Sequence, residues 1–264
     1  MSLLLFLAMA TASCFSWSNK PSILLVGDSI TQGGFNGGHL GYAALLSAHL
    51  NPSRDVYNRG YSGYTTRDIA PMFSDLLATT LTAAHSHHAL VVVFLGANDA
   101  VFPGKPQHVP LARFEEHLLA FTVHLRGTFP ASKLLLVSPA PPVAESEFPR
   151  VNLGLSFQGR EEDTDGINTG LLKRHRRPND RNHTVTRLYR DIVLRVAKNA
   201  ASEHVGAMDT WRMMFGEDTN EVVYNRDVAD SFYGDGLHYN EKGDATHYSY
   251  LVKSVRRLWP ELGF

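Results

Sequence analysis

Cysteine is nearly absent, since the chain has one, Cys14, among 264 residues. A single cysteine excludes a disulfide framework and a cysteine-based metal site within one chain. No charge is in excess either, because 25 Lys and Arg residues are balanced by 26 Asp and Glu residues. This balance gives no indication of a nucleic-acid partner. We interpret the one basic cluster, KRHRRPNDR at 173–181, as a solvated loop.

Apolar runs long enough to cross a membrane are also lacking, so no stable membrane span is predicted. The N-terminal run LLLFLAMATAS, at 3–13, is followed by small residues as in a secretory signal, but no positive residue precedes it. Residues 1–19 are therefore expected to be either a cleaved signal peptide or an N-terminal extension. A signal would favour a secreted or endomembrane location over a cytoplasmic one.

The rest of the chain alternates apolar runs with segments that favour helices, which predicts an α/β fold with a parallel sheet covered on both faces. Residues 20–264 are expected to form one domain. The predicted strands lie at 22–26, 54–58, 89–95, 133–138 and 204–209. The predicted helices lie at about 39–50, 66–84, 111–127, 184–202 and 241–258.

One region interrupts this alternation. Residues 145–183 are rich in Pro, Gly, Asn and charge, and a stretch of that length without regular structure is uncommon in a compact domain. Such an insertion is either a functional lid near a site or a tolerated surface excursion. The composition leaves both alternatives open.

The first strand ends in ILLVGDSITQGG, at 23–34, which places an acid and a hydroxyl at the end of a buried strand. A phosphate-binding turn is one explanation, but the Walker lysine and the dinucleotide glycine spacing are both missing. The other explanation is that Ser29 is a nucleophile. A serine hydroxyl is a weak nucleophile, and it needs an adjacent base that is itself oriented by a third group.

Candidates for the base, for the group that orients it and for the oxyanion donors lie elsewhere in the chain. Asp235 and His238 are three residues apart, and on one helical turn they would lie on the same side, where the carboxylate could orient the imidazole. An oxyanion needs donors, and the backbone N–H groups of Ser29 and Gly63 with the Asn98 amide could supply them. Gly and Asn are also common turn residues, so each of these segments alone is a weak signal.

Taken together, four segments resemble the SGNH hydrolases, also called GDSL esterases and lipases. The matching blocks, in order, are GDSIT at 27–31, NRGYSG at 58–63, GAND at 96–99 and DGLH at 235–238. The resemblance implies a flavodoxin-like α/β/α sandwich with a central parallel five-stranded sheet. It implies that Ser29, Asp235 and His238 form a catalytic triad. It also implies that the oxyanion hole consists of Ser29, Gly63 and Asn98. Asp28 is implied to have a structural role.

Within that family, GDSITQGG, FLGANDA and DGLHYNEKG make the chain most similar to the isoamyl acetate-hydrolysing esterase group. The expected activity is hydrolysis of short-chain or acetyl carboxylic esters through an acyl-enzyme. Alternatives are a carbohydrate acetylesterase, a lysophospholipase-type lipase, or a non-catalytic carbohydrate or lipid binder. No cofactor and no metal are expected, and HSHH at 85–88 is interpreted as a loop. The expected partner is a small-molecule ester, and homo-oligomer formation stays open.

Overall fold

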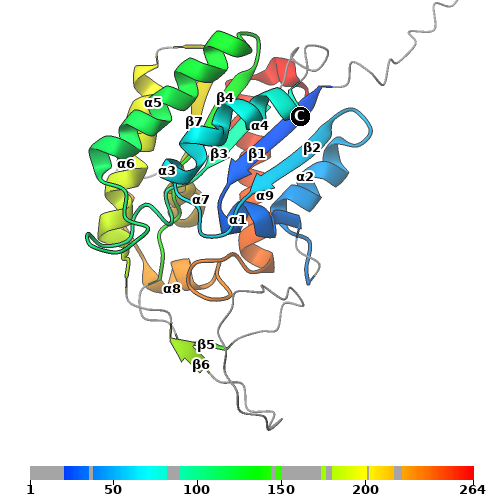
Figure 1. The fold of residues 1–264 in the computed structure, drawn as a ribbon. Coiled ribbons are helices and arrows are strands. Elements are labelled where there is room, and N and C mark those ends of the chain that lie inside the picture. Colours follow the sequence, from blue (N-terminus) through cyan, green and yellow to red (C-terminus); the bar gives the residue numbers. More distant parts are fainter. Residues whose placement is uncertain are drawn as a thin grey trace, which may run out of the picture.

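The central element is a five-stranded parallel sheet with strand order β2-β1-β3-β4-β7 (Figure 1). A computed structural model describes residues 21–35, 38–81, 90–143, 147–149, 174–176, 180–200, 202–216 and 222–264. The sheet strands are β1 (Ser22–Gly27), β2 (Asp55–Gly60), β3 (Leu90–Phe94), β4 (Lys133–Val137) and β7 (Val205–Met208). The order is that of flavodoxin-like folds, which confirms the predicted fold class.

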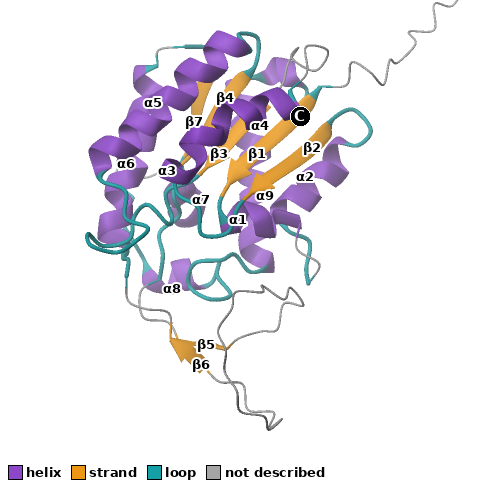
Figure 2. Ribbon diagram, viewed as in Figure 1, coloured by secondary structure: helices purple, strands orange, loops and turns teal. Residues whose placement is uncertain are grey.

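Helices cover both faces of this sheet (Figure 2). One face packs against α3 (Thr66–Ile69), α4 (Phe73–Thr80), α5 (Leu111–Thr128) and α6 (His183–Asn199). The other packs against α1 (Ser29–Gln32), α2 (Tyr42–Leu50), α7 (Thr210–Phe215), α8 (Arg226–Asp230) and α9 (Glu241–Leu258). In the part of the chain that the structure describes, the layers also include the single-turn 3₁₀ helices η2 (Gly33–Phe35), η3 (Ala70–Met72) and η4 (Pro260–Leu262).

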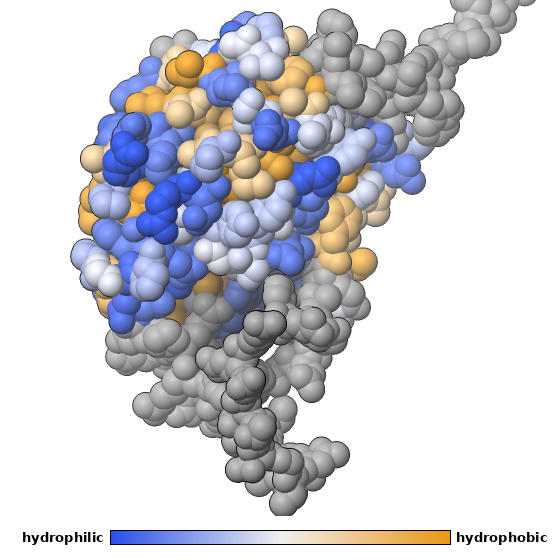
Figure 3. All heavy atoms as spheres, in the orientation of Figure 1, coloured by the Kyte–Doolittle hydropathy of each residue, from blue (hydrophilic) through white to orange (hydrophobic). Residues whose placement is uncertain are grey.

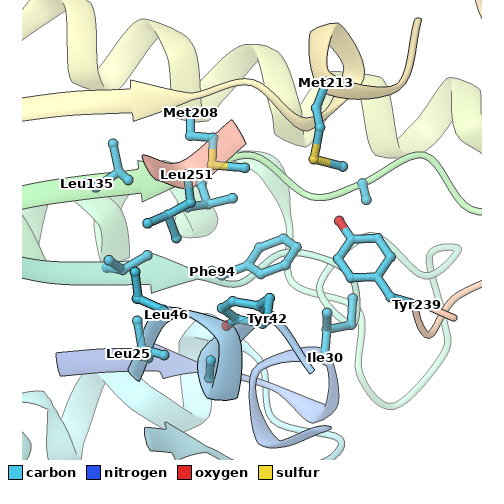
Figure 4. Packing of buried hydrophobic residues seen from close by; sticks show 14 of the residues in the cluster. Leu25, Ile30, Tyr42, Leu46, Phe94, Leu135, Met208, Met213, Tyr239 and Leu251 are labelled. Atoms are coloured by element: carbon cyan, nitrogen blue, oxygen red, sulfur yellow. The ribbon is translucent and has the colours of Figure 1, made fainter. Parts of the chain in front are cut away.

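The unbroken apolar run of the first strand follows from this double coverage. In β1, Ile23 and Leu25 pack on the α2 and α9 side, while Leu24 and Val26 pack on the α5 and α6 side. Figure 4 shows the first of these clusters, in which Leu25 lies with Phe94 of β3 among residues from the covering helices. Each buried large apolar side chain contributes roughly 1.5–3 kcal/mol relative to exposure.

The predicted helix at 66–84 differs from the structure in one respect. It is divided into α3 and α4 by the 3₁₀ helix Ala70–Met72. Pro71 accounts for this break, because proline has no N–H to donate to the preceding turn. Three short helices, α1, α7 and α8, were not predicted. The last two begin at polar caps, Asp209 and Asn225, whose side chains accept a backbone N–H of the first turn.

The 145–183 region is described only in part. Its strands β5 (Glu147–Pro149) and β6 (Arg174–Arg176) pair as an antiparallel two-stranded sheet, and residues 180–182 lead into α6, which begins at His183. The remainder lies outside the described residues, as do the predicted leader at 1–19 and HSHH at 85–88. The single-domain organisation, the insertion and the leader therefore stay predictions.

The described surface mixes hydrophilic and hydrophobic residues on the face seen in Figure 3. Among the described helices, none combines the length and the apolar composition needed to span a membrane.

A buried histidine makes stability depend on pH. His247 of α9 is fully buried between the rings of Tyr42, Phe94 and Tyr239, and burial lowers its pKa to about 3. In the unfolded chain the same group takes up a proton at its ordinary pKa near 6.5. As pH falls from that value toward about 3, only the unfolded state binds this proton, so the native state loses stability.

Replacing His247 by phenylalanine removes this contribution. Between about pH 6 and pH 4, the free energy of unfolding of His247→Phe should fall less steeply than that of the parent, by up to about 1.4 kcal/mol per pH unit. Urea unfolding followed at several pH values measures both slopes. Equal slopes for the two proteins would contradict the assignment of a neutral His247.

Candidate active site

The strand order reverses between β1 and β3, and ligands of such sheets bind outside the carboxyl ends of the strands at this point. Ser29 follows β1 after one residue, Asp28, and Asn98 follows β3 after three residues, 95–97. Figure 1 shows α1, which begins at Ser29, at this end of the sheet. Neighbouring parallel strands thus deliver two of the predicted site residues to one edge.

The turn between β1 and α1 is fixed by its own residues. Asp28 caps α1 by accepting the Ile30 backbone N–H at 2.9 Å, and Ser29 is the first helical residue. A Cβ at Gly27 would lie 2.0 Å from Thr31 Oγ1, so glycine is required there. Burial raises the pKa of Asp28 to about 6. These contacts agree with a structural role for Asp28.

His238 connects two of the predicted catalytic residues. Its Nε2 lies 2.8 Å from Ser29 Oγ, and its Nδ1 lies 2.7 Å from Asp235 Oδ2. The side chain of His238 is 37% exposed, so a small molecule can reach it. An ionised carboxylate only accepts, so Nδ1 carries the hydrogen and Nε2 is left to accept the Ser29 hydroxyl proton.

The predicted helical turn for Asp235 and His238 is wrong, because both residues lie in a loop before α9. Asp235 Oδ1 accepts the backbone N–H groups of Leu237 and His238, at 3.0 and 2.7 Å. Gly236 between them has a φ of 73°, a conformation that favours glycine. The aspartate therefore folds the loop back on itself and holds the imidazole with its second oxygen.

The segment with Gly63 is anchored to the Ser29 turn. The Tyr61 backbone N–H donates to the Gly27 carbonyl at 2.9 Å, and the Ser62 N–H donates to Gln32 Oε1 at 2.8 Å. Gly63 itself has a φ of 79°, where a side chain would be strained. Ser29 N–H, in the first turn of α1, lacks an intrahelical partner by its position.

Asn98 is nearly buried, at 4% exposure, and contacts the neighbour of Gly63. Its Nδ2 donates to the Tyr64 carbonyl at 2.9 Å, which leaves the second N–H of the carboxamide for another acceptor. Direct contacts thus join Ser29, His238 and Asp235. Asn98 reaches the Gly63 segment through Tyr64 instead.

Asp99 was missed as a residue that shapes the site. It is fully buried, and its Oδ1 accepts both the backbone N–H and the hydroxyl of Thr66, at 2.9 and 2.5 Å. Burial raises its pKa to about 7. Asp99 thereby fastens the helix that follows Gly63 to the turn that carries Asn98. Its place beside Asn98 in GAND was the available signal.

Comparison with known proteins places the chain in a family. Residues 25–246 match the GDSL-like lipase/acylhydrolase family. The chain belongs to this family. An isoamyl acetate-hydrolyzing esterase 1 homolog of Bos taurus is 31% identical over 262 residues, 97% of this chain and 89% of that protein. The human homolog is 28% identical over 251 residues, 93% and 86% of the two chains.

Solved structures of low sequence identity share the fold of this family member. An aryl esterase of M. smegmatis has a TM-score of 0.57 at 21% identity, with 90% of this chain and 98% of that chain covered. An acetylxylan esterase of Geobacillus stearothermophilus has a TM-score of 0.58 at 16% identity, covering 89% and 94%. The predicted resemblance is therefore confirmed, including its similarity to the isoamyl acetate-hydrolysing group.

Family and relatives identify the chain as a carboxylic ester hydrolase, the reaction class predicted from the sequence. In the part of the chain that the structure describes, no cluster of three His, Cys, Asp or Glu side chains could hold a metal ion. The individual roles of Ser29, Gly63, Asn98, Asp235 and His238 stay predictions.

Proposed function

We propose that this protein is a serine esterase that hydrolyses short-chain carboxylic esters through an acyl-enzyme on Ser29. The observation that carries the proposal is the hydrogen-bonded series from Ser29 Oγ to His238 and from His238 to Asp235. A nucleophile, a base and a group that orients the base are the three parts that activate a serine hydroxyl.

The reaction follows from this arrangement. Ser29 Oγ attacks the ester carbonyl carbon while its proton moves to His238 Nε2. The carbonyl oxygen becomes an oxyanion, which accepts from the backbone N–H groups of Ser29 and Gly63 and from the Asn98 amide. Collapse of the intermediate breaks the bond to the alcohol, which leaves with the proton from His238.

Water completes the cycle. His238 removes a proton from water as the water oxygen attacks the acyl carbonyl carbon, and a second oxyanion forms at the same donors. Its collapse breaks the bond to Ser29 Oγ, which regains the proton, and the carboxylic acid is released. Asp235 keeps the imidazole in the required tautomer and stabilises the imidazolium in both halves.

A short acyl group is favoured by the relatives, several of which are named as isoamyl acetate-hydrolyzing esterase homologs. The predicted order of turnover on p-nitrophenyl esters is acetate and butyrate above octanoate and longer chains. Steady-state kcat/KM across this series, with an acetylated xylo-oligosaccharide and a lysophospholipid beside it, measures the preference. A maximum on the sugar or on the lysophospholipid would contradict the short-chain assignment and favour the corresponding alternative.

A covalent intermediate provides the direct test of the mechanism. Rapid acid quench during turnover of p-nitrophenyl acetate should trap an acetyl group, which raises the mass of the peptide that contains Ser29. An acetyl group found on another residue, or full turnover with none formed, would contradict acyl transfer through Ser29.

A further inference from the structure

The chain segment that precedes α6 docks on the turn that carries Asn98. The Phe102 backbone N–H donates to the Asp180 carbonyl at 2.6 Å, and Arg181 Nη1 donates to the Ala97 carbonyl at 2.7 Å. Arg181 is the last residue of the basic cluster at 173–181. The interpretation of that cluster as solvated is wrong for Arg181, whose side chain is only 11% exposed.

The Arg181 guanidinium is held on a second side by its own neighbour. Nε donates to Asp180 Oδ1 at 2.9 Å and Nη2 donates to Oδ2 at 3.3 Å. This fork orients the planar group and points Nη1 toward Ala97. A guanidinium can make both sets of bonds at once, because its five N–H donors have a fixed planar arrangement.

The Ala97 carbonyl and the Asn98 N–H belong to the same peptide unit, which is planar. Holding the carbonyl therefore fixes the plane from which the Asn98 side chain departs toward Tyr64. Arg181 is also near enough to the Ser29 turn that its charge lowers the pKa of Asp28, against the larger opposite effect of burial.

We propose that Arg181 is a positioning residue for the oxyanion donor Asn98, and that it acts through the Ala97–Asn98 peptide. The inference rests on the proposed function, in which Asn98 donates to the oxyanion. Removing the guanidinium frees this peptide to rotate, and small displacements of a group that stabilises the transition state cost up to about a hundredfold in rate. Ground-state binding of the ester should change little.

The test compares kcat and KM for Arg181→Ala, Arg181→Lys, Asn98→Ala and the Arg181→Ala/Asn98→Ala double variant on p-nitrophenyl acetate. Arg181→Ala should lower kcat by about tenfold to a hundredfold, with KM changed less than about threefold. Arg181→Lys keeps the positive charge, but an ammonium group cannot bind Asp180 and Ala97 together as the planar guanidinium does. Most of the loss of kcat should therefore remain in this variant. In the double variant, loss of Arg181 should add less than about twofold to the effect of Asn98→Ala.

Arg195→Ala is the matched control. Arg195 makes a similar fork on Glu115, at 3.1 and 2.8 Å, on the exposed surface of α6 and α5, and its removal should leave kcat unchanged. Melting temperatures show which variants are folded. If Arg181→Ala does not fold, the loss of kcat is measured on Arg181→Lys instead.

The outcomes separate the two proposals. A folded Arg181 variant with kcat within twofold of the parent, full recovery by Arg181→Lys, or additive losses in the double variant would each overturn the positioning role. If Asn98→Ala itself leaves kcat unchanged, Asn98 is not an oxyanion donor. That result would contradict this part of the proposed function, independently of Arg181.

Discussion

Ser29→Ala is expected to lower kcat on a short-chain ester by about 10⁵- to 10⁶-fold, the scale seen when a serine hydrolase loses its nucleophile. The reason is that in the proposed mechanism Ser29 Oγ, which lies 2.8 Å from His238 Nε2, is the oxygen that forms the acyl bond. Without it, the remaining rate is that of water attack assisted by the oxyanion donors. Steady-state turnover and labelling by a fluorophosphonate probe both measure the change.

His238→Ala should lose nearly as much, since nucleophile and base act as one unit, and the double variant should lose little more. Asp235→Asn should cost about 10⁴-fold, because an amide can favour the wrong imidazole tautomer. Ser62→Ala is the control, because Ser62 is exposed in the Gly63 segment and its backbone, not its hydroxyl, binds Gln32. Probe labelling of Ser29→Ala at the parent level would refute the assigned nucleophile.

Asn98→Ala is expected to lower kcat by about a hundredfold to a thousandfold, the cost of one oxyanion donor. The carboxamide donates one N–H to the Tyr64 carbonyl, and in the proposed mechanism it donates the second to the developing oxyanion. Asn98→Asp should lose more, because an ionised carboxylate donates nothing and repels the oxyanion. KM should change much less than kcat, since the interaction matures in the transition state.

The competing explanation is that Asn98 only secures the turn after β3. In that case both substitutions would lower the melting temperature and leave kcat per folded molecule unchanged. Asn225→Ala shows what a structural asparagine does, because Asn225 caps α8 by accepting the Val228 N–H at 3.0 Å. It should cost about 1 kcal/mol of stability and no turnover. Melting temperature and kcat measured on the same preparations distinguish the two explanations.

The local sequence pattern is enough to predict those features of this protein that depend on residues close together in the chain. The apolar runs at 22–26 and 133–138 predict strands buried on both faces, because every side chain of such a strand meets a helix layer. Alternation of strands with helices predicts the parallel sheet. The residue types in GDS, GAND and DGLH favour acyl transfer. A hydroxyl, an amide, a carboxylate and an imidazole together supply a nucleophile, an oxyanion donor, a group that orients the base and the base itself.

Tertiary structure decided what depends on groups distant in sequence. The spacing of Asp235 and His238 suggested a helical turn, whereas two backbone N–H groups and Gly236 make a loop that gives the same contact. No local rule indicates that Asp99 holds Thr66, 33 residues away, or that Arg181 reaches Ala97 across 84 residues. A charged cluster resembles a solvated loop until the fold brings a buried carbonyl to one of its residues. The sequence alone therefore determined the sheet and the chemical groups, while long-range hydrogen bonds decided how those groups are held, because these bonds form only once the fold has brought the distant segments together.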